Sequence, residues 1–261
     1  MQEESPRLAV AVLAHNEADE LASLLATVPF ADEIVVADAE STDDTAAVAR
    51  SAGARVISVR NDFNLNVNKT AAFEACRGDW ILYLDPDEIV TPELAAAIEA
   101  AVSRDENPYA AYAFPRRNNY FGKYLKHGGA YPDYQLRLFR RGKARFACRS
   151  VHERLEVDGR VGRLEPPLLH NTYPTVADYL RKLPFYVAAG ADALQRASLR
   201  PGFGADLWHF LFRPAIRFGR RYLVKGGFLD GANGFLACLL DAVQGVLAYY
   251  EYRRRVSSRE P

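Results

Sequence analysis

The amino-acid sequence predicts an α/β fold, built on a mainly parallel sheet with helices on both faces. Short apolar runs rich in Val and Ile alternate with segments of helical period through the N-terminal part of the chain. The connections between them are short, which favours parallel strands joined by covering helices. The chain has 261 residues, 49% of them hydrophobic and 25% charged, so it is long and apolar enough to bury a full core.

The first strand is expected at residues 7–13, because this run is apolar and follows no helical period. Apolar residues then recur at the spacing of one helix face, at Leu21, Leu24, Leu25 and Val28. The pattern predicts a strand followed by a helix that covers it.

The same alternation continues along the chain. Further strands are expected at 33–38, 55–59 and 79–84. Helices are expected at 41–52, 68–76 and 91–102, the last with Thr91-Pro92 at its start. Each strand is therefore followed by a helix in the sequence.

Acidic residues follow two of these strands. Asp38 ends the second strand, and Asp85 and Asp87 follow the fourth. In open α/β sheets, ligands bind beyond the carboxyl ends of the strands, so these side chains mark a candidate site. Asp85 and Asp87 have no evident basic partner and would repel each other, whereas a divalent ion such as Mg²⁺ or Mn²⁺ takes one or two carboxylates together with phosphate oxygens. A solvated acidic turn is the alternative.

Several function classes are disfavoured. No GxGxxG follows the first strand and no GxxxxGK[ST] occurs, which argues against a dinucleotide dehydrogenase and a P-loop NTPase. Lys+Arg and Asp+Glu both number 33, so no net charge attracts nucleic acid, and the three cysteines lie too far apart for a disulfide scaffold or a zinc site. The N-terminus lacks the basic and apolar regions of a signal peptide, and no charge-free run of about 18 apolar residues occurs, so we expect a cytoplasmic protein without a spanning helix.

Five segments in this order carry a specific resemblance, at 12–17, 37–45, 78–88, 131–141 and 151–153. The first three, which include His-Asn-Glu, Asp-Ala-Glu-Ser-Thr-Asp and Leu-Asp-Pro-Asp-Glu, resemble family 2 glycosyltransferases of the GT-A fold. The last two resemble the bacterial branch that includes lipopolysaccharide-core β-1,4-glucosyltransferases. The resemblance implies an inverting transfer of a hexose, with glucose expected, from a UDP-sugar to a cell-envelope glycolipid or lipopolysaccharide-core acceptor.

The resemblance also assigns roles around the nucleoside. It implies that Asn16, Glu17 and Asp38 hold the uridine, and that Lys69 lies near the base or the diphosphate. Glu40 departs from the pattern, because relatives commonly have a small residue at its position. An extra carboxylate is therefore expected beside the nucleoside.

The metal–diphosphate is assigned by the same resemblance to Asp85 and Asp87, with Mn²⁺ or Mg²⁺ as the ion. His152 is a candidate ligand of the metal or diphosphate, with a neutral hydrogen-bonding role as the alternative. Arg137 is expected to contact the diphosphate or an anionic acceptor, or else to lie on a solvated strand face. His170 carries no spacing argument, so a structural role is expected for it.

Inversion requires a base that takes the proton of the attacking hydroxyl. Asp133 is the first candidate, because it follows a Gly-Gly loop and precedes a strand-like segment at 134–139. Glu153 is its rival, and an ordinary turn residue is the alternative role for Asp133.

The domain organisation follows from a change in composition near residue 175. We expect a catalytic domain over 1–175, with a nucleotide-sugar half to about residue 104 and an acceptor half beyond it. Residues 176–261 form a helical extension, with a helix at 178–200 interrupted by Pro184.

The extension combines cations with aromatic residues. Between 207 and 229 there is no acid, but five cations occur, namely Arg213, Arg217, Arg220, Arg221 and Lys225. Such a segment is typical of a helix at an anionic membrane surface, so we expect a peripheral protein on the cytosolic face of the inner membrane, and no nucleic-acid partner. The alternatives are a helical pair packed on the catalytic domain and a homo-oligomer contact.

Other functions stay open at this point. The donor could serve a different acceptor, such as a polysaccharide, a protein or a lipid phosphate. A sugar nucleotidyltransferase shares the layered sheet but commonly has a glycine-rich basic loop after the first strand, which His15-Asn16-Glu17 does not provide. A catalytically silent binding protein is a third class, and the retained carboxylates speak against it.

Overall fold

The computed structural model describes residues 8–62, 64–148 and 153–258. The chain divides into two compact units. The sheet unit comprises residues 1–116 and 133–170, and the helical unit comprises residues 117–132 and 171–261. The chain therefore leaves the sheet unit at residue 116, returns at 133, and leaves it again at 170.

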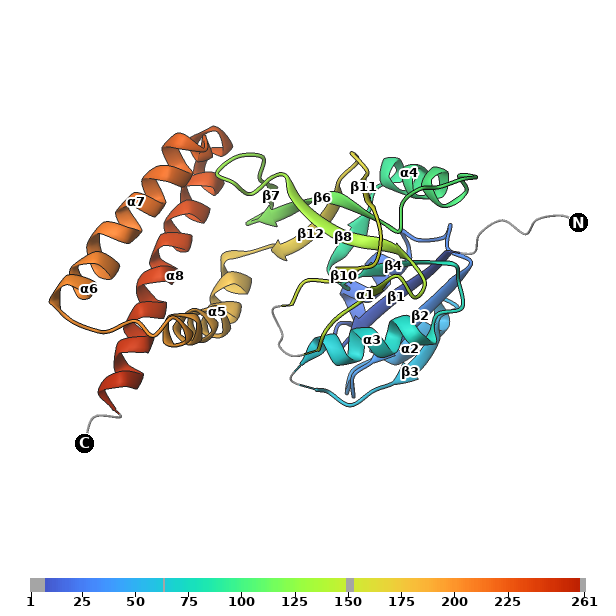
Figure 1. Ribbon diagram of the computed structural model, residues 1–261, viewed down its shortest axis with the longest axis horizontal. Coiled ribbons are helices and arrows are strands. Elements are labelled where there is room, and N and C mark those ends of the chain that lie inside the picture. The colour runs from blue at the N-terminus through green and yellow to red at the C-terminus, as the bar shows by residue number, and fades with distance from the viewer. Residues whose placement is uncertain (1–7, 63, 149–152, 259–261) are drawn as a thin grey trace, which may run out of the picture. The chain divides into compact units, whose positions relative to one another are not determined.

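Four parallel strands form one part of the sheet, in the order β3-β2-β1-β4. Their bounds are Leu8–Ala14 for β1, Glu33–Asp38 for β2, Arg55–Ser58 for β3 and Trp80–Leu84 for β4. These agree closely with the expected strands, so the α/β prediction with a mainly parallel arrangement is confirmed. The carboxyl ends of β1, β2 and β4 meet at one edge (Figure 1).

The sheet continues as β8-β6-β12-β5. Their bounds are Asp133–Arg140 for β8, Ala111–Tyr120 for β6, Leu168–Tyr173 for β12 and Glu88–Val90 for β5. β8 is antiparallel to both β4 and β6, and β12 is antiparallel to β5. Shorter strands complete the fold: β7 at Lys123–Tyr124, β9 at Ala144–Arg145, β10 at Glu156–Val157 and β11 at Val161–Arg163.

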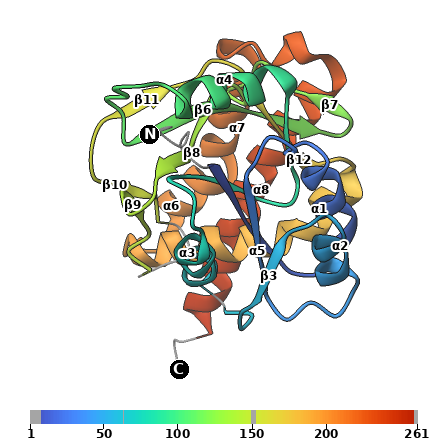
Figure 2. The same cartoon turned by 90° about the vertical axis from the view of Figure 1, so that its right-hand side faces the viewer.

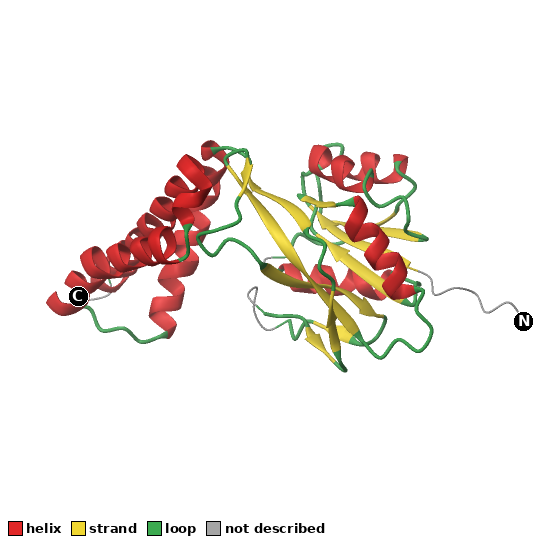
Figure 3. Cartoon of the chain, turned by 90° about the horizontal axis from the view of Figure 1, so that it is seen from above, coloured by secondary structure: helices red, strands yellow, loops and turns green. Residues whose placement is uncertain are grey.

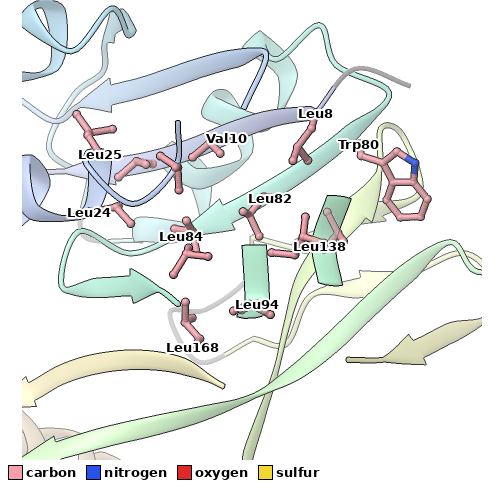
Figure 4. Close-up of a cluster of buried hydrophobic side chains, with 14 of the residues drawn as sticks. Leu8, Val10, Leu24, Leu25, Trp80, Leu82, Leu84, Leu94, Leu138 and Leu168 are labelled. Carbon is pink, nitrogen blue, oxygen red and sulfur yellow. The ribbon is translucent and has the colours of Figure 1, made fainter. Parts of the chain in front are cut away.

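The central strand β1 is buried on both faces, which explains its unbroken apolar sequence. Because side chains alternate along a strand, Val10 and Val12 enter one core while Ala9 and Ala11 enter the other. Figure 4 shows the first core, where leucines from the strands and helices meet around Leu82. The two cores therefore cover both faces of the parallel strands.

Helices cover these cores. Their bounds are Ala18–Leu25 for α1, Thr45–Ser51 for α2, Leu65–Ala75 for α3 and Pro92–Val102 for α4. α1, α2 and α4 contribute to the first core and α3 to the second, with α1 and α2 side by side (Figure 2). α3 begins three residues before the expected start, because the side chain of Asn64 accepts a hydrogen bond from the Asn66 amide and caps the helix.

The helical unit contains three long helical segments (Figure 3). α5 spans Val176–Arg196 and is capped by a reciprocal pair of hydrogen bonds between Thr175 and Asp178. Pro184 lies inside α5 without ending it, so the predicted interruption is wrong. The helix is held by its packing against the long C-terminal helix.

The second segment runs from 203 to 224 as alternating α- and π-helical stretches. These are α6 at Phe203–Leu207, η1 at Trp208–Phe212, α7 at Arg213–Gly219 and η2 at Arg220–Val224. A short 3₁₀ turn, η3 at Gly227–Asp230, leads into α8 at Gly231–Ser257. By length and composition the segment Gly227–Ser257 could cross a membrane, against the expectation that no segment could, although one such helix is weak evidence for a span.

Residues 117–132 are held by side chains of the helical unit itself. Asn233 donates hydrogen bonds to the backbone oxygens of Tyr120 and Phe121, at 3.0 and 2.8 Å. The carboxylate of buried Asp230 accepts from the amides of Lys126 and His127, at 3.1 and 2.8 Å. This segment, the excursion of residues 117–132 out of the sheet unit, is therefore an integral part of the helical unit.

The cations of the helical unit are not all available to lipid. Arg217 reaches Asp241 on α8 with Nε at 2.5 Å and Nη2 at 2.7 Å, and Arg221 reaches it at 2.9 Å. The expectation that no acid lies near these arginines is wrong, because Asp241 comes from a different helix. Arg220 and Lys225 are exposed.

Candidate functional site

The loops after β1 and β2 are joined by one side chain. Asn16 has a positive φ of 54°, a conformation that Asn tolerates better than most residues. Its Oδ1 accepts hydrogen bonds from the amides of Thr42 and Asp43, at 2.7 and 3.3 Å. The two loops therefore form one wall at the carboxyl edge of the sheet.

Asp38 and Glu40 lie in the same wall. Asp38 is the last residue of β2 and is buried, and its Oδ1 accepts from the Ser41 amide at 3.3 Å. Glu40 also has a positive φ, 57°, and accepts from the Asn61 amide at 3.2 Å. Glu40, two residues after Asp38, is thus held by the loop after β3.

Glu17 is the most perturbed group of this wall. Its carboxylate accepts from the His15 amide at 3.2 Å. Burial raises the pKa of Glu17 to about 7, and the negative charges of Asp87, Glu20 and Asp85 add to the increase. A cation bound at this edge would favour the ionised form of Glu17.

Asp85 is surrounded by cations. Its Oδ2 accepts from Arg137 at 2.5 Å, and its Oδ1 lies 3.3 Å from the Lys69 ammonium and 2.5 Å from the Tyr83 hydroxyl. Burial alone would raise the pKa of Asp85, but Arg137 and Lys69 outweigh it and hold the pKa well below its usual range. The expectation that Asp85 has no basic partner is therefore wrong.

The same cations enclose the Tyr83 ring. The Arg137 guanidinium carbon lies 4.5 Å from the ring centroid, and Lys69 Nζ lies 4.8 Å from it. Burial raises the pKa of the Tyr83 hydroxyl far above its usual value, so it stays protonated and donates to Asp85. Arg137 is thus a buried partner of the site and does not lie on a solvated strand face.

Glu88 completes this network, and the sequence interpretation missed it. It is fully buried, accepts from Arg137 at 2.6 Å, and accepts from the Asp85 amide at 2.9 Å. Burial raises the pKa of Glu88, although Arg137 opposes the increase. The sequence feature that could have indicated Glu88 is its position directly after Asp85-Pro86-Asp87, because a third acid there needs a basic partner.

Asp87 faces a different partner. Its Oδ2 lies 3.2 Å from Nε2 of His170. The antiparallel pairing of β12 with β5 places His170 opposite Glu88, one residue beyond Asp87. His170 therefore belongs to the site, a role that its sequence position could not show.

Asp133 is the first residue of β8, and both oxygens of its carboxylate accept hydrogen bonds. Arg116 donates to its Oδ2 from Nε at 3.1 Å and from Nη2 at 2.9 Å. Gln135 donates to its Oδ1 at 2.8 Å. The neighbouring β6 supplies Arg116, because the β6–β8 pairing sets Arg116 opposite Asp133.

One cavity of about 570 Å³ in the sheet unit connects the surroundings of Asp85 with those of Asp133. The predicted site residues among those that line it are Lys69, Asp85, Asp133, Arg137 and Glu153. Both candidate bases thus share a cavity with the carboxylate of the fourth strand. His152, the predicted metal or diphosphate ligand, lies outside the described residues.

Comparison with known proteins decides the family. Residues 9–155 match the profile described as Glycosyl transferase family 2, which is more than half of the chain. The chain belongs to glycosyl transferase family 2.

Relatives and solved structures agree with this assignment. The chain is 28% identical over 262 residues to the lipopolysaccharide core biosynthesis glycosyltransferase LpsC of Rhizobium meliloti, covering 97% of this chain and 95% of that protein. It is 29% identical to an uncharacterized glycosyltransferase of Rickettsia typhi, covering 86% and 81%. The mannosyltransferase PcManGT of Pyrobaculum calidifontis, solved with GDP-Man and Mn²⁺, has a TM-score of 0.56 at 13% identity and covers 96% of this chain and 88% of its own.

A further fold match is S. aureus TarS 1–349 in complex with UDP, with a TM-score of 0.50 at 15% identity over 94% of this chain and 91% of its own. These matches confirm the GT-A fold. Family membership confirms the predicted glycosyltransferase class and sets aside both the nucleotidyltransferase and the silent binding protein as readings of this chain.

Within this family 2 chain, the predicted residues fall into three groups. Asn16, Glu17, Asp38 and Glu40 form the wall of the loops after β1 and β2. The residues that line the cavity form the second group, and Asp87 with His170 forms the third. Arg140, three residues after Arg137, packs over the Trp80 ring at 4.6 Å and donates to the Tyr109 carbonyl, so its role is structural.

Proposed function

We propose that this chain is an inverting, metal-dependent hexosyltransferase. It moves a hexose, with glucose expected, from a UDP-sugar to a cell-envelope glycolipid or a lipopolysaccharide-core acceptor. The observation that carries the proposal is the single cavity shared by Asp85, Lys69 and the candidate base Asp133. The name of the full-length relative LpsC supports the acceptor class.

The nucleoside is proposed to bind at the wall formed by Asn16, Asp38 and Glu40, next to Glu17. Carboxylate and amide oxygens there can accept hydrogen bonds from a base and a ribose. The diphosphate would lie toward Lys69, whose charge offsets that of the leaving group. Arg137 then acts on Asp85, because its guanidinium is already engaged with Asp85 and Glu88.

The metal is proposed to bind at Asp87 and His170. Their oxygen and nitrogen lie 3.2 Å apart, and a carboxylate with an imidazole suits Mn²⁺ better than Mg²⁺. Among the described residues no group of three His, Cys, Asp or Glu side chains is placed to hold an ion. A small protein ligand set fits an ion that completes its shell with diphosphate oxygens and water, and the bound ion would offset charge on the leaving diphosphate.

Asp133 is proposed as the base that accepts the proton of the acceptor hydroxyl. Arg116 and Gln135 fix the orientation of its carboxylate, as a base held ready for one proton requires. Glu153 lines the same cavity and is the alternative base.

The helical unit is proposed to hold the protein on the anionic cytosolic surface of the inner membrane. Several of its large apolar side chains are exposed, among them Trp208, Phe212, Ile216 and Leu223. Exposed apolar groups beside cations favour an anionic lipid interface. A homo-oligomer contact through the same helices is the outcome that would replace this proposal.

The donor is tested with a panel of UDP-, GDP- and dTDP-hexoses, measuring nucleotide release with Mn²⁺, with Mg²⁺ and with EDTA. Release from UDP-glucose with Mn²⁺, and none with EDTA, is expected in the presence of a lipopolysaccharide-core acceptor. Equal release from GDP-mannose would assign a different base, and full activity in EDTA would sink the metal assignment.

A further inference from the structure

A second cavity lies within the helical unit, and none of the residues assigned above to the donor, the metal or the base lines it. Its volume is about 340 Å³, and residues of α5, α7 and α8 line it. Gly190 of α5 lies so close to α8 that an added Cβ would be 2.7 Å from the Cβ of Ala248. Gly245 also lines the cavity, and an added Cβ there would meet nothing within 4 Å. The small residues thus bring the helices together and leave open space beside Gly245.

Positive charge is in surplus at this cavity. Arg213 and Arg217 line it together with one carboxylate, that of Asp241. Asp241 already pairs with both Arg217 and Arg221, so two arginines share this one acid. Arg213 adds a further positive charge to the lining of the cavity.

Arg213 is the cation that lacks a counter-charge. Its side chain donates from Nη1 to Nδ1 of His209 at 3.0 Å, and no carboxylate within the described ranges forms an ion pair with it. His209 is buried and stacks on Tyr249 with ring centroids 4.3 Å apart. Burial and the charge of Arg213 lower the pKa of His209, so the ring is neutral and accepts this hydrogen bond.

The cavity also offers neutral donors. The carboxamide oxygen of Gln244 lies 3.4 Å from the Tyr179 hydroxyl, and Gln244 lines the cavity beside Asp241. With its oxygen turned to Tyr179, the NH₂ group of Gln244 is left to donate. A partly buried guanidinium next to an amide donor is a favourable site for a phosphate, because the planar fork of Arg matches phosphate oxygens.

The surroundings favour a phosphate that is attached to a lipid. Phe212 and Ile216 directly precede the two arginines in the sequence and are 47% and 56% exposed. Phe185 precedes the cavity residue Tyr186 and is 56% exposed. Acyl chains could cover such side chains while the headgroup reaches the arginines, whereas a free phosphate would leave them in water.

We propose that the cavity between α5, α7 and α8 is a binding site for the phosphate of an anionic lipid headgroup, with Arg213 as its principal ligand. The proposal rests on the membrane association proposed above and adds a specific site to it. It is independent of donor and metal binding, because every residue that carries it belongs to the helical unit.

The test uses the full chain and measures co-sedimentation with two kinds of vesicle. One contains phosphatidylcholine alone, and the other contains phosphatidylcholine with phosphatidylglycerol. Arg213→Gln should weaken binding to the anionic vesicles about 10- to 100-fold, since a hydrogen bond to a charged group contributes about 1.5–3 kcal/mol. Arg220→Gln is the matched control, because it removes the same charge from an exposed position of the same helical segment.

A second pair of variants tests the cavity itself without changing charge. Gly245→Leu should fill the space and weaken binding about tenfold or more, whereas Gly245→Ala should bind like the wild type. Both changes also favour the helix, so neither is expected to unfold it. If Arg213→Gln proves unstable in thermal unfolding, the Gly245 pair still decides the question.

Three results would overturn the proposal. Equal weakening by Arg213→Gln and Arg220→Gln would show a diffuse electrostatic attraction. Undiminished binding of Gly245→Leu would show that the cavity is not used. Binding of inorganic phosphate as tight as that of the lipid, measured by calorimetry, would show a site for free phosphate. Calorimetry of UDP with Mn²⁺ on the same samples reports separately on the donor site, so failure of one proposal is distinguishable from failure of the other.

Discussion

The sheet unit and the helical unit each place an aspartate between two cations, and they do so in opposite surroundings. Asp85 lies between Arg137 and Lys69 at the edge of a sheet whose parallel strands pack between two apolar cores. Asp241 lies between Arg217 and Arg221 on helices that expose many apolar side chains. The first network therefore serves a site built into a core. The second balances charge on a unit that leaves many large apolar side chains exposed among the described residues.

The largest effect is expected at the proposed base in the sheet unit. Asp133→Asn keeps the hydrogen-bonding shape but cannot accept a proton, so turnover should fall by about 10²–10⁴. Donor affinity should change little, because Asp133 is proposed to act on the acceptor hydroxyl. Steady-state kinetics of Asp133→Asn and Glu153→Gln give the answer. A dead Glu153→Gln beside an active Asp133→Asn would reverse their roles.

The second prediction compares the two ion networks directly. Arg137→Met leaves Asp85 and Glu88 without their buried partner and should cost about 3–5 kcal/mol of unfolding free energy. The same change at Arg217, whose side chain is 45% exposed against 7% for Arg137, should cost about 1 kcal/mol or less. Urea unfolding of the two variants measures both. Equal losses would show that the networks are energetically alike.

The third prediction concerns the metal. UDP with Mn²⁺ at about 100 times its Kd should stabilise the protein by about 2.7 kcal/mol. Asp87→Asn and His170→Ala should each remove most of the metal-dependent part of this gain, as read by thermal shift with and without EDTA. Unchanged metal dependence in both variants would contradict the assignment of Asp87 and His170.

The smallest effect is expected from the titration of Glu17. Its folded pKa of about 7 exceeds the ordinary value of 4.5, so the folded state binds its proton more tightly than the unfolded state. The resulting stability is fully present below pH 4.5 and is lost as the pH rises through 7. In Glu17→Gln, the unfolding free energy should therefore fall by about 1–2 kcal/mol less than in the wild type as the pH rises from 4.5 to above 7; this magnitude allows for the partial exposure of Glu17.

Asp19→Asn is the matched control for Glu17, because Asp19 is exposed in the first turn of α1 and is not among the charges that raise the pKa of Glu17. Denaturant unfolding at a series of pH values compares the two slopes. If neither change alters the dependence of unfolding free energy on pH, the titrating group is not Glu17.

The parallel part of the sheet was predictable because strands buried on both faces must be apolar throughout. β1, β2 and β4 met that condition and were found within a residue or two. β5 has three residues, and its burial comes from pairing with β12, about eighty positions later. Such a strand leaves no periodic signal in its own sequence.

The site was predictable in its residues but not in its partners. Asp85 and Asp87 stood out by their place after a buried strand. Their partners Arg137 and His170 come from strands far along the chain, and antiparallel register alone brings them there. The same holds for Asp241, whose pairing with Arg217 joins two helices that the sequence shows only as separate segments.

The excursion of residues 117–132 into the helical unit bears on how the protein can be divided. A chain cut after residue 170 would retain this excursion but lose Asn233 and Asp230, which hold its backbone. Conversely, the C-terminal helices expressed alone would lack residues 117–132, whose backbone those side chains bind. The helical unit is therefore not a detachable anchor, and a gene fusion or domain exchange would have to transfer both of its segments together.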